Sequence, residues 1–223
     1  MFKSVIFYTN KLKVLKRFYG NMMELPITQS SDEEFTVKVG ESTITFKQSD
    51  RSSFYHFAIN IPGNQFSLMK SWIKDRLTLN REAGTDEVYF PNFDADSIYF
   101  EDPAGNIIEL IGRRKRDLFG NVTPYSFLNV SEVSMTTPYV IDVGDQLQDF
   151  GIPLWQETEI DPLALNFLGK DDTFIVLVPP ERKWYFSESK SETHPLEITL
   201  SNNRHILLNA DGKISLSDET KED

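Results

Sequence analysis

One pattern recurs along the chain and limits what it can fold into: a strand, then an amphipathic helix, then further strands. Apolar residues at three- and four-residue spacing predict helices over 12–22 and 65–77, and period-two alternation predicts the strands around them. The first copy lies between residues 2 and 48, and the second between 55 and 111, so a unit of roughly 50 residues occurs twice. The chain is therefore expected to be an α+β protein built from βαβββ units.

The second half of the chain repeats the order less completely. A strand over 130–135, a helix over 139–151 and two strands over 163–180 form a third unit. After it come three strand-like runs with no helix, which predict a truncated fourth unit. We expect one domain over 1–113, a linker over 114–123, a degenerate second domain over 124–216 and a disordered tail over 217–223.

Composition excludes several classes of function. The 223 residues carry a net charge of -11 and no cysteine, so the chain repels phosphate backbones and anionic lipids and has no thiolate ligands or nucleophiles. The basic run Arg113 to Arg116 is better explained as part of the linker than as a phosphate site, because the chain as a whole is acidic. We expect a cytoplasmic protein that binds neither nucleic acid nor membrane.

Two strands of the second unit carry polar side chains on one face. Alternation in the strand YHFAINI places Phe57, Ile59 and Ile61 toward the helix, and His56 and Asn60 on the opposite face with Ala58. In NIIELI the same argument separates Ile108 and Leu110 from Glu109, and in SIYF it leaves Ser97 and Tyr99 facing away from the helix. His56, Asn60, Ser97, Tyr99 and Glu109 can therefore converge on one face of one sheet, as a site for a metal or a polar ligand.

The strand YHFAINI and the hairpin SIYFEDPAGNIIELI give the chain a family resemblance. It resembles the glyoxalase/bleomycin-resistance/dioxygenase group, the vicinal oxygen chelate superfamily, most closely over residues 1–113. The resemblance implies that βαβββ units pair into cupped mixed sheets around a small-molecule cavity, with a divalent metal where there is chemistry. It implies His56 and Glu109 as metal ligands, whereas the first unit has Ser4 in place of a histidine, and Thr45 or Lys47 in place of a carboxylate.

A third metal ligand has two weaker candidates. Asp96 lies just before the hairpin strand, but its parity matches that of Ile98 on the helix side. Glu132 stands where the first-strand histidine of the third unit would fall, although a solvated strand residue is the simpler explanation. The aromatic residues Trp155, Trp184, Tyr185 and Phe186 are expected to cover the core of the third unit.

Two functions remain open at this stage. The first is a metal-dependent lyase, isomerase or ring-cleaving dioxygenase, with Zn, Mn, Ni or Fe held by His56 and Glu109, and with Tyr99 or Asn60 orienting the substrate. The second is a metal-free module that binds or sequesters a small molecule in the same cup, in which His56 and Glu109 are only a buried ion pair. In the first case metal affinity should fall with pH through the histidine range near ~6.5. Because the chain holds at least three units, we expect a monomer or a weak homodimer.

Overall fold

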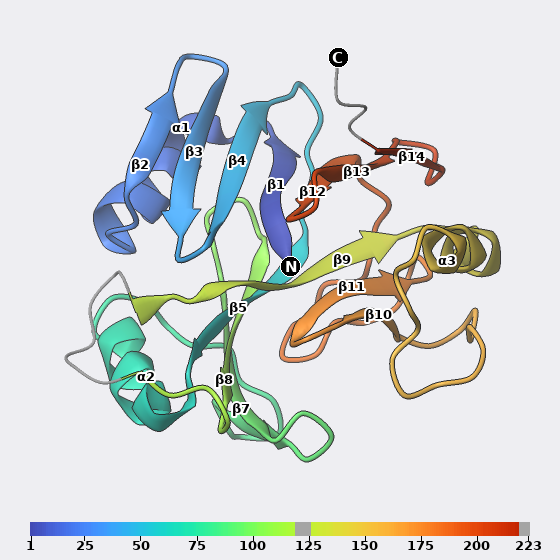
Figure 1. The fold of residues 1–223 in the computed structure, drawn as a ribbon. Coiled ribbons are helices and arrows are strands. Elements are labelled where there is room, and N and C mark those ends of the chain that lie inside the picture. The colour runs from blue at the N-terminus through green and yellow to red at the C-terminus, as the bar shows by residue number, and fades with distance from the viewer. Residues whose placement is uncertain (119–125, 219–223) are drawn as a thin grey trace.

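In the part of the chain that the structure describes, two mixed β-sheets form the body and three α-helices pack against them (Figure 1). The structure is a computed structural model and describes residues 1–118 and 126–218. Sheet A has the strand order β14-β13-β12-β1-β4-β3-β2, and sheet B has the order β10-β11-β9-β5-β8-β7-β6. This is the α+β architecture with cupped mixed sheets that the repeating pattern predicts.

The first two units both follow the predicted order of strand, helix and three strands. The first contains β1 (Phe2–Thr9), α1 (Leu12–Arg17), the π-helical turn η1 (Phe18–Met22), β2 (Ile27–Ser30), β3 (Glu34–Val39) and β4 (Ser42–Gln48). The second contains β5 (His56–Pro62), the 3-10 turn η2 (Gly63–Gln65), α2 (Phe66–Lys74), β6 (Val88–Phe90), β7 (Ala95–Glu101) and β8 (Ile107–Arg113). In each unit the first and last strands lie side by side and parallel.

The last two units are shorter, also as predicted. The third contains β9 (Asn129–Thr136), α3 (Val140–Asp149), β10 (Asn166–Lys170) and β11 (Thr173–Val178). The fourth contains β12 (Leu196–Leu200), β13 (Arg204–Leu208) and β14 (Ile214–Asp218). In the third unit the first and last strands, β9 and β11, are again parallel neighbours.

The units pair within the sheets differently from what we expected. The first and second units were expected to share one cup, but β1 pairs with β12 of the fourth unit and β5 pairs with β9 of the third. Alternation fixes which face of a strand is buried and says nothing about which strand lies beside it, so the sequence could not decide this point. The division into domains over 1–113 and 124–216 stays a prediction.

Both predicted connecting segments fall partly outside the described residues. Within the linker 114–123, residues 119–123 lie outside them, as do residues 219–223 of the tail. At the start of the basic run, Arg113 is the last residue of β8 and is fully buried, and residues 217 and 218 belong to β14.

The core lies between the two sheets and the helices. Phe7 of β1 stacks on Phe57 of β5 with ring centroids 5.2 Å apart, which joins the sheets at their central strands. The remaining apolar side chains of β5 and β8 that were assigned to the helix side, including Ile59, Ile108 and Leu110, lie in the same core. Burial of such side chains contributes about 1.5–3 kcal/mol each relative to exposure.

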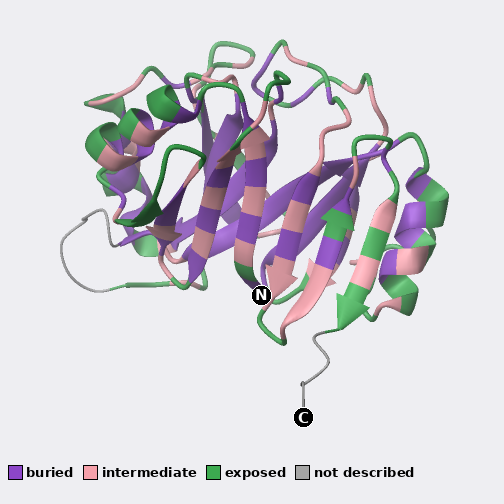
Figure 2. Ribbon diagram, turned by 90° about the horizontal axis from the view of Figure 1, so that it is seen from above, coloured by how far each residue is buried: buried purple, intermediate pink, exposed green. Residues whose placement is uncertain are grey.

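The opposite faces of the two sheets differ in burial. Along β1, β4 and β12 of sheet A, buried residues alternate with partly exposed ones, as the banded strands in Figure 2 show. In sheet B every residue of β5, β8, β9 and β11 is buried. Alternation marks a sheet with one solvated face, whereas continuous burial marks a sheet covered on both faces. Sheet B therefore has a covered cup, and sheet A has an open one.

Much of that cover comes from the segment that leads from β11 to β12, residues 179–195, which we call the cover segment. Its Trp184 and Phe186 are buried, and both backbone polar groups of Phe186 are hydrogen-bonded. The backbone N–H of Phe186 donates to Glu82 Oε2 at 2.7 Å, and Asn80 Nδ2 donates to the Phe186 carbonyl at 2.8 Å. These bonds tie the cover segment to the loop between α2 and β6.

Candidate functional site

Three neighbouring strands of sheet B bring a histidine and two glutamates together. His56 is the first residue of β5, and Ala58, two residues later on the same face, lies opposite both Glu109 of β8 and Glu132 of β9. Ala58 has no side chain beyond Cβ, so it leaves space between the two carboxylates. The pleat places His56 on the same face as Ala58, beside that space.

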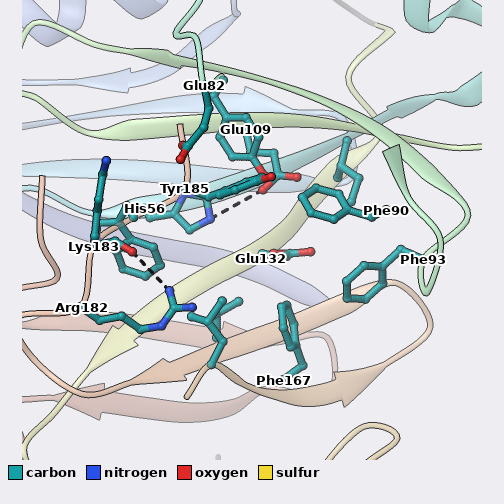
Figure 3. Close-up of a pocket in the computed structure, with 15 residues that line it drawn as sticks. His56, Glu82, Phe90, Phe93, Glu109, Glu132, Phe167, Arg182, Lys183 and Tyr185 are labelled. Atoms are coloured by element: carbon teal, nitrogen blue, oxygen red, sulfur yellow. Dashed lines mark hydrogen bonds and ion pairs between the residues drawn. The ribbon is translucent and has the colours of Figure 1, made fainter. Parts of the chain in front are cut away.

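The possible ligand atoms of these three residues are close enough to share one ion. They all lie within 4.8 Å of one another, and His56 Nε2 is 3.7 Å from Glu109 Oε2. Figure 3 shows the three side chains converging from their separate strands on one part of a cavity. Nitrogen and carboxylate ligands bind zinc at about 2.0–2.2 Å, which puts ligand atoms roughly 3–4 Å from one another, so small side-chain movements suffice.

Contacts on the far side of the imidazole orient His56 for this purpose. His56 Nδ1 is 3.2 Å from the carbonyl oxygen of Ile107, which can only accept a hydrogen bond. Nδ1 therefore carries the proton, and the lone pair of Nε2 faces Glu109. Such a backbone contact to the second ring nitrogen is the usual arrangement of a metal-binding histidine.

Burial shifts all three groups toward their uncharged forms. His56, Glu109 and Glu132 expose only 6%, 3% and 4% of their surfaces. Burial lowers the pKa of His56 to about 4, an effect that the Ile107 carbonyl opposes. Burial and the neighbouring Glu109 raise the pKa of Glu132 to about 8, and burial raises the pKa of Glu109 against the Ser97 and Tyr99 hydroxyls and the Arg113 charge.

These shifts change how the pair of His56 and Glu109 is understood. A buried ion pair between them, one of the sequence interpretations, needs a protonated imidazole at neutral pH. The lowered pKa of His56 leaves the imidazole neutral there. Ionising the two buried carboxyls beside a neutral imidazole is costly unless a cation lies among them, and a divalent ion is such a cation.

A buried arginine stands behind the cluster. Arg113 Nη2 is 3.4 Å from Glu132 Oε1, and Arg113 Nε is 3.2 Å from Asp172 Oδ1. Its Nη1 donates to Ser131 Oγ at 2.9 Å and to the side-chain oxygen of Asn60. The arginine therefore contacts one oxygen of Glu132 and favours its ionised form, against the effect of burial.

The cluster opens into a cavity of about 390 Å³, which is large enough for a small organic molecule. Six aromatic side chains contribute to its walls, and three charged side chains besides the cluster line it. The aromatic residues are Phe90, Phe93, Tyr99, Phe167, Trp184 and Tyr185, and the charged ones are Glu82, Arg182 and Lys183. Flat aromatic walls favour a flat ligand, because stacked rings gain about 0.5–1.5 kcal/mol beyond the area that they bury.

The structure brings together some of the predicted site residues and separates others. His56, Glu109 and Tyr99 line the cavity, and Glu132 joins them as the third member of the cluster. Ser97 is fully buried in β7. It lies two residues before Tyr99, which pairs with Glu109, and therefore on the same face of the strand as Tyr99.

Two candidates lie elsewhere. Asn60 is buried, but its side chain bonds Arg113, Asn129 Oδ1 and the Asp172 carbonyl and does not line the cavity. Asp96 is half-buried on β7, where its carboxylate lies 3.5 Å from Arg114. Its parity with Ile98, noted in the sequence, is the reason that it does not join the cluster.

The sequence interpretation missed the arginine and the cover segment. Arg113 stands at the start of a basic run that is typical of a linker, so its burial left no signal. Trp184, Tyr185 and Phe186 were expected to cover the core of the third unit, but Trp184 and Tyr185 line the cavity and Phe186 stacks on Tyr99 at 4.9 Å. A Gly-free aromatic run between two strands is the one signal that could have suggested a covering loop.

Internal symmetry of sheet B shows where a fourth ligand is missing. In the second unit, His56 pairs with Ile107, and Glu109 lies two residues after Ile107. In the third unit, Glu132 pairs with Phe174, and the residue two positions after Phe174 is Val176, which also lines the cavity. The third unit therefore contributes one carboxylate and one apolar side chain where the second contributes a histidine and a carboxylate.

Comparison with known proteins supports the fold. Residues 130–182, which include Glu132, match the family of toxoflavin-degrading enzymes. No curated protein sequence matches the chain. In the part of the chain that the structure describes, no helix is long and apolar enough to cross a membrane.

Solved structures match over longer stretches. A candidate dioxygenase from Bacillus subtilis subsp. subtilis str. 168 superposes with a TM-score of 0.61 at 11% identity, covering 98% of this chain and 85% of that one. Lactoylglutathione lyase from Agrobacterium tumefaciens gives a TM-score of 0.43 at 16% identity, over 52% of this chain and 95% of that one. The fosfomycin resistance protein FosX from Mesorhizobium loti gives 0.37 at 17%, over 50% and 90%. With its βαβββ units in two curled mixed sheets, the chain has the fold of the glyoxalase/bleomycin-resistance/dioxygenase superfamily.

Proposed function

We propose that the chain is a metal-dependent enzyme that acts on a small, flat organic molecule, as a lyase, isomerase or ring-cleaving dioxygenase. The observation that carries the proposal is the buried cluster of His56, Glu109 and Glu132, with ligand atoms within 4.8 Å, at the wall of an aromatic cavity. The similarity of residues 130–182 to toxoflavin-degrading enzymes supports a degradative reaction.

In this proposal the three cluster residues hold the ion, which is Zn, Mn, Ni or Fe. The bound ion would supply Lewis-acid stabilisation of a developing negative charge on a substrate oxygen. Val176 of β11 has no ligand atom, so the side of the cluster toward β11 is left for a substrate oxygen.

Tyr99 is suited to donate a proton or a hydrogen bond to the substrate. Burial and the carboxylates of Glu109 and Glu132 raise the pKa of Tyr99 well above its usual value. The phenol therefore stays protonated at its Oη atom across the working range. Its ring, stacked on Phe186, is held in place at the cavity wall.

Metal uptake by protein purified without a histidine tag tests the proposal. Calorimetric titration of metal-free protein with Zn²⁺, Mn²⁺, Ni²⁺ and Fe²⁺ should give one tight site for at least one ion. His56→Ala, Glu109→Ala and Glu132→Ala should each abolish it while leaving the thermal melt cooperative. Asp96→Ala is the matched control, because Asp96 was a ligand candidate that the structure places beside Arg114. No binding of any ion by the parent would refute the proposal.

Metal affinity should begin to fall at a higher pH than the sequence suggests. Metal binding needs His56 neutral and both glutamates ionised. Because the pKa of His56 is lowered to about 4 and that of Glu132 is raised to about 8, Glu132 and not His56 loses a proton on binding near neutral pH. Affinity should therefore fall as pH decreases below about 8, not only below the histidine range.

A metal-free binding module remains the second candidate. The raised pKa values of both glutamates allow the cluster to stay uncharged with no ion present. Val176 also stands where a fourth ligand would be expected. In that case the same cavity would hold a small molecule by aromatic stacking and polar contacts alone. The titrations above separate the two functions.

A further inference from the structure

Among the described residues no carboxylate pairs with Arg182, although this arginine is partly withdrawn from solvent. The side chain is half-buried at the cavity wall, and its guanidinium makes one long hydrogen bond, from Nη1 to the carbonyl of Lys183 at 3.4 Å. Figure 3 shows it on the side of the cavity opposite Glu82. Its pKa is lowered by burial, with no acid to oppose the shift.

The other arginines show how unusual this is. Each remaining arginine either has an ion pair or is exposed to solvent. Ion pairs hold Arg76, Arg113, Arg114, Arg116 and Arg204, and the exposed ones are Arg17, Arg51 and Arg81. A partly desolvated guanidinium without a counter-charge is costly, and an anionic partner would offset that cost.

The neighbouring charges of the cavity cannot serve as that partner. Glu82 uses Oε2 to hold the backbone of Phe186, and Lys183 pairs with Glu188 at 2.9 Å. Neither Glu82, Glu109 nor Glu132 forms an ion pair with Arg182. The positive charge of Arg182 therefore has no counter-charge among the described residues that line the cavity.

Hydrogen bonds hold the backbone of Arg182 in the cover segment. Arg182 N–H donates to Ser191 Oγ at 3.0 Å, and Ser191 N–H donates to the Arg182 carbonyl at 2.8 Å. Ser191 is itself buried and its hydroxyl donates to the carbonyl of Pro179. A ligand then has to immobilise only the side chain of Arg182 and not the backbone that carries it.

We propose that Arg182 binds an anionic group of the ligand, so that the cavity takes flat aromatic compounds that carry a carboxylate or a similar oxyanion. The guanidinium presents two parallel N–H donors to a carboxylate, and the aromatic walls contact the ring. The proposal rests on the proposed function for identifying the cavity as the substrate site. It does not require a bound metal.

The test compares a charged and a neutral probe of the same shape. Calorimetric titration of metal-free, chelator-treated protein with 2-naphthoate and with 2-naphthamide should show tighter binding of the acid. Arg182→Gln should weaken binding of the acid roughly ten- to a hundredfold and leave the amide unchanged, since a hydrogen bond to a charged group is lost. Because Arg182 has no ion pair, its replacement should not lower the thermal melting temperature.

Lys190→Gln is the matched control. It removes a positive charge from the same cover segment, but Lys190 is exposed, pairs with Glu181 at 3.1 Å and lies outside the cavity lining. It should leave the affinity for both probes unchanged. The proposal is overturned if the parent binds neither probe, if it binds both equally, or if Arg182→Gln weakens both to the same degree. A parent that takes up no metal but prefers the acid would refute the proposed function and support this inference.

Discussion

Glu132 shows how a single position connects the site to the stability of the fold. It faces Glu109 across Ala58 and is 4% exposed, so burial and the neighbouring carboxylate favour the protonated form of its carboxyl group. Strand parity could indicate from the sequence that Glu132 faces a cup, but not that β9 would lie beside β5. Whether it was a solvated strand residue or a ligand depended on that contact.

The stability of the metal-free protein should fall as pH rises from 6.5 to 8. The pKa of Glu132 is about 8 in the folded protein and near the ordinary 4.5 when unfolded, so unfolding releases a proton within this window. Stability is then lost as pH rises through the folded value. His56, whose pKa is lowered to about 4, has the opposite effect only below about 6.5.

Thermal melts at several pH values check this expectation. Glu132→Gln should flatten the decrease between pH 6.5 and 8, whereas Glu41→Gln, at an exposed turn, should keep it. A melting temperature of the metal-free parent that rises over this range would show that Glu132 is ionised in the folded state.

Arg113 should be far more important for stability than the arginine next to it. Arg113→Met leaves the buried oxygens of Asn60, Ser131 and Glu132 without their shared donor. It also takes one of three cations from Asp172. Each buried group left unsatisfied costs about 1–3 kcal/mol, so we expect a total loss of about 3–5 kcal/mol. Arg114 is 56% exposed and its contacts to Asp94 and Asp96 are 3.8 and 3.5 Å, so Arg114→Met should cost about 1 kcal/mol or less. Denaturant unfolding of both variants measures the difference. Equal losses would mean that the buried network contributes nothing specific.

At the scale of elements, the order of strands and helices followed from sequence periodicity, but neighbours in the sheets did not. Alternation gave the correct faces for β5, β7 and β8, because one face of each packs on the core. The cover segment has no periodicity, so nothing in it predicted that it would close the cup. A tight turn at Gly40 and Glu41 joins β3 to β4.

That turn should tolerate no side chain at Gly40. Gly40 has a φ of +55°, and a Cβ there would lie 2.0 Å from the carbonyl oxygen of Leu128, which leads into β9. Gly105 in the β7–β8 turn has a φ of +89° with nothing within 4 Å of a Cβ. Gly105→Ala should therefore lose only the cost of the strained backbone, about 1–3 kcal/mol.

Gly40→Ala should lose more than that, because backbone of the neighbouring unit must also move. Chemical denaturation of the two variants in parallel checks the difference. If Gly40→Ala is no more destabilising than Gly105→Ala, the contact between this turn and the segment before β9 is not tight in solution.

At the scale of the whole molecule, the pairing of units makes the two ends of the chain interdependent. Strand β1 lies between β4 and β12, so residues about 200 apart are hydrogen-bonded neighbours, as Phe2 and Leu200 are. Strand β5 lies between β8 and β9 in the same way. The sequence suggested a first domain that ends at residue 113, but each of its central strands has one neighbour beyond that point.

Residues 1–113 expressed alone should therefore fail to form a stable monomer. Without β12 and β9, the fragment would expose the edges of β1 and β5, whose side chains include Phe7 and Phe57 of the common core. Unpaired, apolar strand edges pair with other chains, so aggregation or dimerisation is expected. Size-exclusion chromatography with light scattering, beside the full-length chain as control, measures this. A monomeric fragment with a cooperative thermal melt would instead support the domain boundary near residue 113, and would mean that the pairing between units adds stability to domains that already fold alone.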